Sequence, residues 1–269
     1  MKFGCCLNMV STQPDGTGIE WIEDLAAFGY DYVELPTAQM MALDADALDA
    51  LKQRLKRANI PCETSNNFFP TTMRLTGPDV DMDAIMDYVR RALTLDEELG
   101  VQYLVFGSGP AKNVPDGFPM DVGYQQVVAL LKRVGSVARE HGVTIVIEPL
   151  RKAECNLINT FAEGVQLAKD VDDPNVRVLV DFYHLTEEHE SVQHLLDDGR
   201  DYLRHVHFAN PTGRVFPDKA DEADYAPFIA ALKELDYDLH VSCEAYAPNG
   251  FRQAAPIARC FFAQQFKEE

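Results

Sequence analysis

Short apolar segments alternate with longer amphipathic ones along the whole chain, and this alternation limits the folds open to it. The short segments are rich in β-branched and aromatic residues and end in Gly, Pro or polar side chains, as buried strands do. We predict strands over residues 2–9, 31–35, 61–67, 101–107, 143–149, 176–182, 203–209 and 239–246. Helical periodicity fills the intervals at 18–29, 44–59, 81–100, 122–142, 160–171, 188–199, 221–235 and 251–266.

Strands that alternate with helices indicate an α/β protein with a parallel sheet. Eight such units in one chain favour a closed (β/α)8 TIM barrel, which commonly reaches this size as one domain. A doubly wound open sheet is the alternative, and it would place a Gly-rich phosphate loop after the first strand. The segment "NMVSTQPDGTGIE" (8–20) contains no G-x-G-x-x-G. We therefore predict a single barrel domain over residues 1–269.

The net charge of the chain limits the kinds of partner that it can bind. There are 24 Lys and Arg against 43 Asp and Glu, a net charge of -19, whereas nucleic-acid binding needs a basic surface.

No apolar run is long enough to cross a bilayer, and "MKFGCCLNMV" carries no signal-peptide pattern, so we expect a soluble, cytoplasmic protein. None of the six cysteines forms a C-x-x-C pair, and we expect buried free thiols.

Four consecutive predicted strands end in groups able to do chemistry. These are Glu148 in "VIEP", Asp181 with His184 in "VDFYH", His207 in "HVHFAN" and Glu244 in "SCEAY". The active site of a TIM barrel lies at the carboxyl ends of its strands, so these side chains are expected at one rim. Three carboxylates facing one volume repel each other, and a divalent cation removes that repulsion. Oxygen donors with one imidazole suit Mn²⁺, Mg²⁺ or Co²⁺.

Two further polar residues lie on predicted strands. His205 shares the face of His207 but lies one pleat deeper, where it either orients a ligand or packs as a core histidine. Glu34 ends the second strand in "DYVELP". We include Glu34 among the substrate-binding residues, with a contact to neighbouring backbone as the alternative.

These motifs resemble the sugar isomerase/epimerase superfamily of xylose isomerase-like TIM barrels, and within it the ketose 3-epimerases of the D-tagatose/D-psicose type. The likeness covers most of the chain and is densest over 143–246. It is carried by "IEPLRKAECNLINT", "DFYH", "HVHFAN" and "CEAY", and "FGSGPAKNVPDGF" after the fourth strand is also typical of the superfamily.

The resemblance implies a metal-dependent sugar epimerase or isomerase that works through a cis-enediolate. Glu148, Asp181, His207 and Glu244 would bind the metal, with manganese expected and magnesium or cobalt as alternatives. Glu148 and Glu244 would also act as the acid and base. A homodimer or tetramer is expected on the same basis.

The resemblance also implies that Glu154 and His184 hold substrate hydroxyls. One departure concerns "HFANPTGR", where Arg214 falls one residue late and Asn-Pro replaces the acidic segment of the epimerases. We still expect Arg214 to reach the substrate. The altered segment leaves other reactions open: aldose–ketose isomerisation, hydroxypyruvate-type isomerisation, and cleavage of a 3-keto-glycoside.

Two other classes are disfavoured. Superfamily endonucleases that act at abasic DNA sites resemble this barrel but need a three-zinc cluster with more histidines and a basic surface, whereas this chain has seven histidines. A non-catalytic sugar-binding barrel would be indicated by the loss of a metal ligand, and none of the four is missing.

Overall fold

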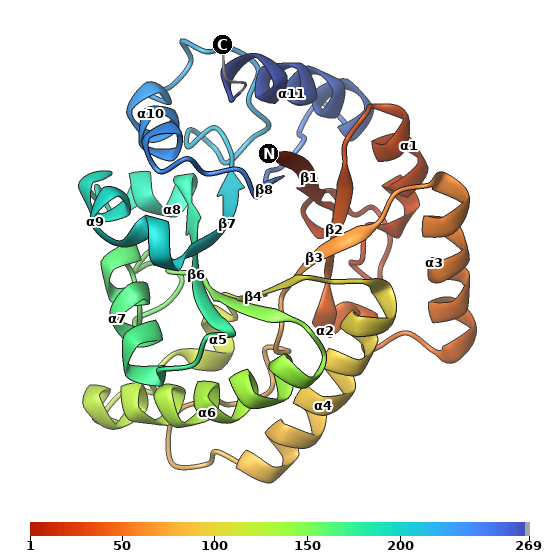
Figure 1. The fold of residues 1–269 in the computed structure, drawn as a ribbon. Helices are drawn as coiled ribbons and strands as arrows, with labels where there is room; N and C mark the ends of the chain where they lie inside the picture. The colour runs from red at the N-terminus through yellow and green to blue at the C-terminus, as the bar shows by residue number, and fades with distance from the viewer. Residues whose placement is uncertain (267–269) are drawn as a thin grey trace.

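The computed structural model of this protein describes residues 1–266. Eight parallel strands are hydrogen-bonded in sequence order, and the eighth returns to pair with the first, so the sheet closes on itself (Figure 1). The predicted (β/α)8 barrel is confirmed. The strands are β1 (Lys2–Cys6), β2 (Tyr32–Pro36), β3 (Cys62–Asn66), β4 (Tyr103–Phe106), β5 (Thr144–Ile147), β6 (Val176–Asp181), β7 (Leu203–Phe208) and β8 (His240–Cys243).

The longer helices form a ring outside the strands (Figure 1). Several begin at side chains that accept hydrogen bonds from the otherwise unpaired first-turn N–H groups, namely Asp44, Asp81 and Thr160. These helices are α1 (Ile22–Ala27), α3 (Ala45–Ala58), α4 (Met82–Leu99), α6 (Met120–Glu140), α7 (Phe161–Val171), α9 (Gln193–Tyr202), α10 (Ala226–Glu234) and α11 (Phe251–Gln265).

Three of the predicted helices begin later than expected. Helix α1 begins at Ile22 instead of residue 18, after a 3-10 turn over Ile19–Trp21. The segment predicted as a helix from residue 188 first turns, because α8 (Phe182–Glu187) follows β6 directly and ends near His189, which has a left-handed φ of 52°. Helix α9 therefore begins at Gln193. Helix α10 begins at Ala226 instead of residue 221. Pro227 lies in its first turn, a position that suits proline because an N–H there would have no partner inside the helix.

Short helical turns follow several strands and were not predicted. They are η1 (Leu7–Val10), η2 (Ile19–Trp21), α2 (Thr37–Met40), α5 (Gly109–Lys112) and α8. Apart from η2, which precedes α1, each directly follows a strand or comes within three residues of its end. They therefore lie at the carboxyl rim of the barrel and shape the space above it.

The main hydrophobic core lies between the sheet and the helices. An example is Phe3 of β1, which stacks on Phe262 of α11 with ring centroids 5.3 Å apart. A smaller apolar cluster of Val105, Val146 and Leu179 occupies the barrel interior. The register pairs Leu179 with His205, so the interior turns polar on that side.

The expectation for the cysteines is confirmed: all six are free, and only Cys260 is exposed. Among residues 1–266, we find no helix with the length and apolar character needed to span a membrane.

Candidate active site

The four predicted metal ligands meet at the carboxyl rim of the barrel. Asp181 ends β6 and His207 lies in β7, while Glu148 and Glu244 directly follow β5 and β8. The backbone N–H of Glu148 donates to the carbonyl of Phe106 (3.2 Å), and that of Glu244 donates to the carbonyl of a β7 residue, Phe208 (3.1 Å). These bonds continue the strand pairing by one residue and fix both glutamates at the barrel mouth.

A glycine makes room for one of these carboxylates. Gly107 follows β4, and a Cβ atom added there would lie 2.2 Å from Oε2 of Glu148. Any side chain at position 107 would therefore displace the carboxylate. The "FGSG" motif thus has a steric role in the site.

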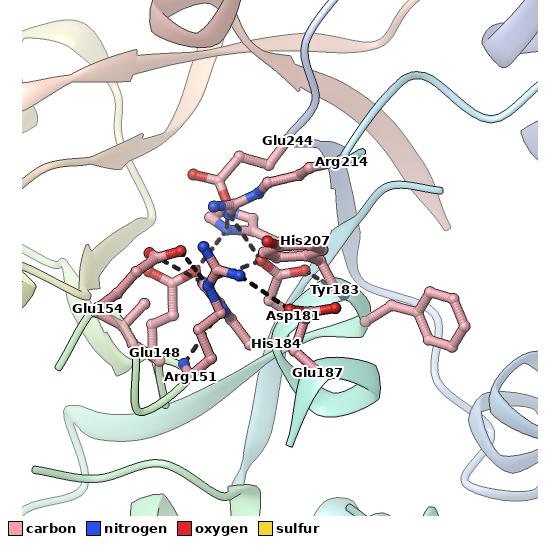
Figure 2. Close-up of polar contacts among 12 residues, drawn as sticks. Glu148, Arg151, Glu154, Asp181, Tyr183, His184, Glu187, His207, Arg214 and Glu244 are labelled. Carbon is pink, nitrogen blue, oxygen red and sulfur yellow. Dashed lines mark hydrogen bonds and ion pairs between the residues drawn. The ribbon is translucent and has the colours of Figure 1, made fainter. Parts of the chain in front are cut away.

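The four side chains form one compact donor cluster (Figure 2). One ligand atom from each of Glu148, Asp181, His207 and Glu244 lies within 4.8 Å of all the others. Nδ1 of His207 is 3.0 Å from both Glu148 Oε1 and Glu244 Oε2. Three carboxylates and one imidazole converging on so small a volume are a donor set that fits a divalent cation.

The "ANPTGR" segment forms a tight turn that aims Arg214 at this cluster. The N–H of Asn210 donates to the carbonyl of Val215 (2.9 Å), and the N–H of Tyr246 donates to the carbonyl of Arg214 (2.8 Å). Arg214 itself has a φ of 50°, a left-handed conformation that is costly for a non-glycine residue and is often found at functional sites.

Arg214 contacts two of the metal-ligand candidates directly. Its Nη2 donates to Asp181 Oδ2 at 2.9 Å and also to Glu244 Oε2. The guanidinium lies over the ring of Tyr183, with Cζ 4.7 Å from the centroid. The proline-containing turn therefore still delivers the arginine to the site.

Burial and mutual repulsion give the three carboxyl groups of the cluster different pKa values. Burial, reinforced by the charge of Glu244, raises the pKa of Glu148. Burial likewise raises the pKa of Asp181 to about 7, although Arg214 opposes the rise. Burial opposes ionisation of Glu244 too, but Arg214 and His207 outweigh it and hold the pKa of Glu244 below its usual range. The cluster does not hold three negative charges without added positive charge.

His184 and Glu154 face the same space. His184 Nε2 is 3.5 Å from Asp181 Oδ2 and 4.0 Å from Glu154 Oε2. On the other side of the ring, Nδ1 accepts the backbone N–H of Arg151 at 3.3 Å, so Nε2 carries the proton of the neutral ring. Burial, followed by the charge of Arg214, lowers the pKa of His184 to about 3.

A second arginine, which the sequence reasoning missed, braces Glu154. Arg151 Nε donates to Glu154 Oε1 at 2.7 Å, and its Nη1 donates to Glu187 Oε2 of α8 at 2.9 Å. Its Cζ lies 5.1 Å from the Tyr183 ring centroid. Arg151 thus ties the loop after β5 to the helix after β6 (Figure 2). The signal for Arg151 in the sequence was its position three residues before Glu154.

Glu34 does not lie where it was predicted. It is fully buried in the barrel interior below the rim, and its oxygens are engaged by Thr64, Ser242, His205 and His207. Side chains that point into a barrel lie in layers at different depths. Glu34 lies one layer below the rim, too deep to face a ligand bound at the mouth of the barrel. The interpretation of Glu34 as a substrate-binding residue is therefore wrong in this structure, which shows His205 beside it in the same buried layer.

The comparisons with known proteins agree with this architecture. A family model described as xylose isomerase-like TIM barrel matches residues 22–260. The chain belongs to this family. It is 27% identical over 241 residues to the L-ribulose 3-epimerase of Methylomonas sp. (strain DH-1), covering 84% of this chain and 77% of that protein. Over 91 residues, 34% of this chain and 35% of the other, it is 32% identical to the 3-dehydro-D-guloside 4-epimerase of Escherichia coli (strain K12).

A solved structure shows the same fold over the full length. The D-psicose 3-epimerase of Clostridium cellulolyticum H10, determined with D-tagatose, matches with a TM-score of 0.86 at 21% identity and covers 100% of both chains. The predicted resemblance to ketose 3-epimerases within the xylose isomerase-like family is confirmed.

Above the cluster, this xylose isomerase-like barrel has an open cavity of about 500 Å³. Glu148, Glu154, His184, Arg214 and Glu244 all line it. The structure therefore brings together the predicted site residues, with Asp181 and His207 at its floor and Glu34 excluded.

The opposite wall of the cavity comes from the first four β/α units and went largely unpredicted. Its polar members include Asn8 after β1, Gln39 in α2, and Asn67 and Ser108 after β3 and β4. Asn67 and Ser108 have left-handed φ values of 48° and 41°. From the sequence, Asn67 and Ser108 fit two roles, hydrogen bonding to sugar hydroxyls or loop formation, and Asn8 fell inside the predicted first strand.

Proposed function

We propose that this protein is a divalent-metal-dependent ketose 3-epimerase. One observation carries the proposal: Glu148, Asp181, His207 and Glu244 offer ligand atoms within 4.8 Å of one another at the floor of a cavity. Membership of the xylose isomerase-like family and the 3-epimerase activity of the Methylomonas relative support it.

The four clustered side chains would hold the cation. When bound, a divalent cation acts as a Lewis acid toward the substrate carbonyl and thereby acidifies the neighbouring C–H bond. In this proposal one of Glu148 and Glu244 removes that proton, which leaves a planar carbon. The other glutamate then returns a proton to the opposite face and inverts the centre. Because β5 and β8 are separated by two strands, the two carboxylates can approach a substrate from different sides.

The remaining cavity residues would orient the sugar. His184 presents Nε2–H toward the floor of the cavity, where it can donate to a hydroxyl oxygen. Glu154 can accept a hydroxyl hydrogen, and Arg151 holds its carboxylate in place. Arg214 lies above the cluster and would donate to substrate oxygens.

The decisive experiment follows proton exchange. Glu148→Gln and Glu244→Gln are each expected to abolish turnover of D-psicose, D-tagatose and L-ribulose while leaving the melting temperature of the protein nearly unchanged. The exposed Glu140→Gln at the end of α6 is the matched control and should turn over like the wild type. Active protein in ²H₂O should place deuterium on the inverted carbon. Turnover without deuterium incorporation would contradict two-base proton transfer.

The second candidate is a reaction on a 3-keto-glycoside, and the E. coli relative favours it because its name describes a 4-epimerase that acts on a 3-dehydro-guloside, a sugar that carries an aglycone. A substrate panel read by ¹³C NMR separates the reactions. Inversion at C3 of a ketose supports the proposal. Migration of the carbonyl indicates aldose–ketose or hydroxypyruvate-type isomerisation. Release of an aglycone from a 3-keto-glycoside indicates a lyase.

Manganese is the ion that we propose, with magnesium and cobalt as alternatives. Metal analysis of the purified protein, followed by reconstitution of chelated protein with each ion, tests this choice. A cytoplasmic location and a homodimeric or tetrameric state stay predictions. Light scattering on the purified protein tests the oligomeric state.

A further inference from the structure

We propose that Glu34 is a positioning residue for metal binding, which holds the ring of His207 so that Nδ1 is the atom offered to the ion. This inference rests on the metal site of the proposed function and assigns a role to a group beneath that site.

Glu34 is built into the barrel interior as a fully satisfied acceptor. Its side chain is 0% exposed. Oε2 accepts from Thr64 Oγ1 at 2.7 Å and from Ser242 Oγ at 2.6 Å, and it lies 2.9 Å from His205 Nε2. Oε1 is left for His207, whose Nε2 is 2.8 Å away. The neighbouring polar groups on β3, β7 and β8 therefore all converge on this one carboxylate.

The hydrogen-bond pattern decides which ring nitrogen of His207 is free to bind the metal ion. An ionised carboxylate only accepts, so the contact with Glu34 requires a hydrogen on Nε2. In the neutral ring the lone pair is then on Nδ1. Nδ1 faces the cluster, 3.0 Å from Glu148 Oε1 and from Glu244 Oε2.

This arrangement matches a general feature of metal sites. A histidine ligand usually donates its second ring N–H to a carboxylate or carbonyl, which fixes the tautomer, orients the ring and makes the ligand more basic. Here the carboxylate comes from β2, across the barrel from the ligand in β7. Closure of the sheet is therefore what brings Glu34 under His207.

The alternative is that Glu34 only fills the barrel interior. A filler would contribute to stability alone, whereas a positioning residue also sets the tautomer of His207 and the affinity for the ion. Two measurements separate these roles, and neither depends on catalytic activity.

The first measurement uses the wild-type chain. The protein is labelled with ¹⁵N-histidine and loaded with Mg²⁺, which is diamagnetic, and long-range ¹H–¹⁵N correlation spectra report the protonation of each ring nitrogen. We expect His207, assigned by its loss in His207→Gln, to carry its hydrogen on Nε2. A hydrogen on Nδ1 of His207 in the loaded protein would overturn the proposal without any need for a Glu34 variant.

The second measurement is the dissociation constant for Mn²⁺, followed by the electron paramagnetic resonance of free Mn²⁺. In Glu34→Gln only the amide oxygen accepts and the NH₂ donates, so the Nε2–H groups of His205 and His207 can no longer both be accepted, and we expect binding to weaken by roughly 10- to 100-fold. Thr64→Val is the matched control: it removes one donor to Oε2 but leaves Oε1 facing His207. We expect Thr64→Val to change the dissociation constant by less than about threefold.

The outcomes separate this inference from the proposed function. If the wild type binds Mn²⁺ and Glu34→Gln binds it equally well, the inference fails while the metal site stands. Equal weakening in Glu34→Gln and Thr64→Val would show a merely structural role and would also overturn it. If the wild type binds no Mn²⁺, the proposed function itself fails.

Discussion

A buried carboxyl group far from the metal cluster should make the stability of this barrel depend on pH. Asp96 of α4 is 0% exposed, and only one of its oxygens has a partner, the hydroxyl of Ser65 on β3 at 3.2 Å. Burial outweighs that hydrogen bond and raises the pKa of Asp96 from 3.8 to about 8. The folded protein therefore keeps a proton that the unfolded chain releases near pH 4.

The sign and size of the effect follow from this difference. Between about pH 4 and pH 8 the folded state binds one more proton than the unfolded state, so the free energy of unfolding falls as pH rises, by about 1.4 kcal/mol per pH unit. From about pH 5 to pH 8 the loss is roughly 4 kcal/mol. Asp96→Asn removes the titration. It also buries an amide hydrogen without an assured partner, which costs about 1–3 kcal/mol at all pH values.

Equilibrium unfolding by urea at about pH 5 and pH 8 tests this. We expect Asp96→Asn to be less stable than the wild type or equal to it near pH 5, and more stable near pH 8. Taking the difference between the two proteins cancels the other titrating groups they share. Asp79→Asn, in an exposed loop before α4, is the control and should leave the pH dependence unchanged. A stability difference for Asp96→Asn that stays constant with pH would refute a protonated Asp96.

Two further changes test the cluster itself. Gly107→Ala should push the Glu148 carboxylate away while leaving the fold intact, and a fall in kcat of roughly 100-fold with an unchanged circular dichroism spectrum is expected. Wild-type kcat in this variant would show that the carboxylate position is not critical. Arg214→Met should destabilise the chelated protein by about 3–5 kcal/mol, because Asp181 and Glu244 lose their buried partner, and excess Mn²⁺ should restore part of the loss. Unfolding followed with and without EDTA checks this, and unchanged stability in EDTA would contradict it.

The barrel could be predicted because its signals are local. Each strand is a brief β-branched run with polar ends. Eight alternating strands and helices, with no Gly-rich phosphate loop after the first strand, favour a closed parallel sheet. The short helical turns at the rim, such as α2 and α8, could not be found in this way. They are only four to six residues long and carry no repeated apolar spacing, so their conformation depends on tertiary contacts.

The metal cluster could be predicted for a different reason. A charged residue that ends an apolar strand is rare, and the barrel topology brings all such residues to one rim. The same rule treated Glu34 like Glu148, because position along a strand does not report depth inside a closed barrel. Depth depends on the stagger between neighbouring strands, and the register shifts by one residue next to Glu34 itself, between Val33 and Glu34.

The polar interior suggests how stability and function are divided in this chain. Barrel interiors are usually filled by layers of branched apolar side chains, but here Glu34, Thr64, His205 and Ser242 replace part of that filling and are all fully buried. Such a network contributes little net stability, since each hydrogen bond replaces one with water, yet leaving any member unpaired is costly. The apolar core between sheet and helices must therefore supply most of the stability. Substitutions in that outer core should lower the melting temperature, whereas loss of the Glu34 carboxylate that faces His207 should act first on metal affinity.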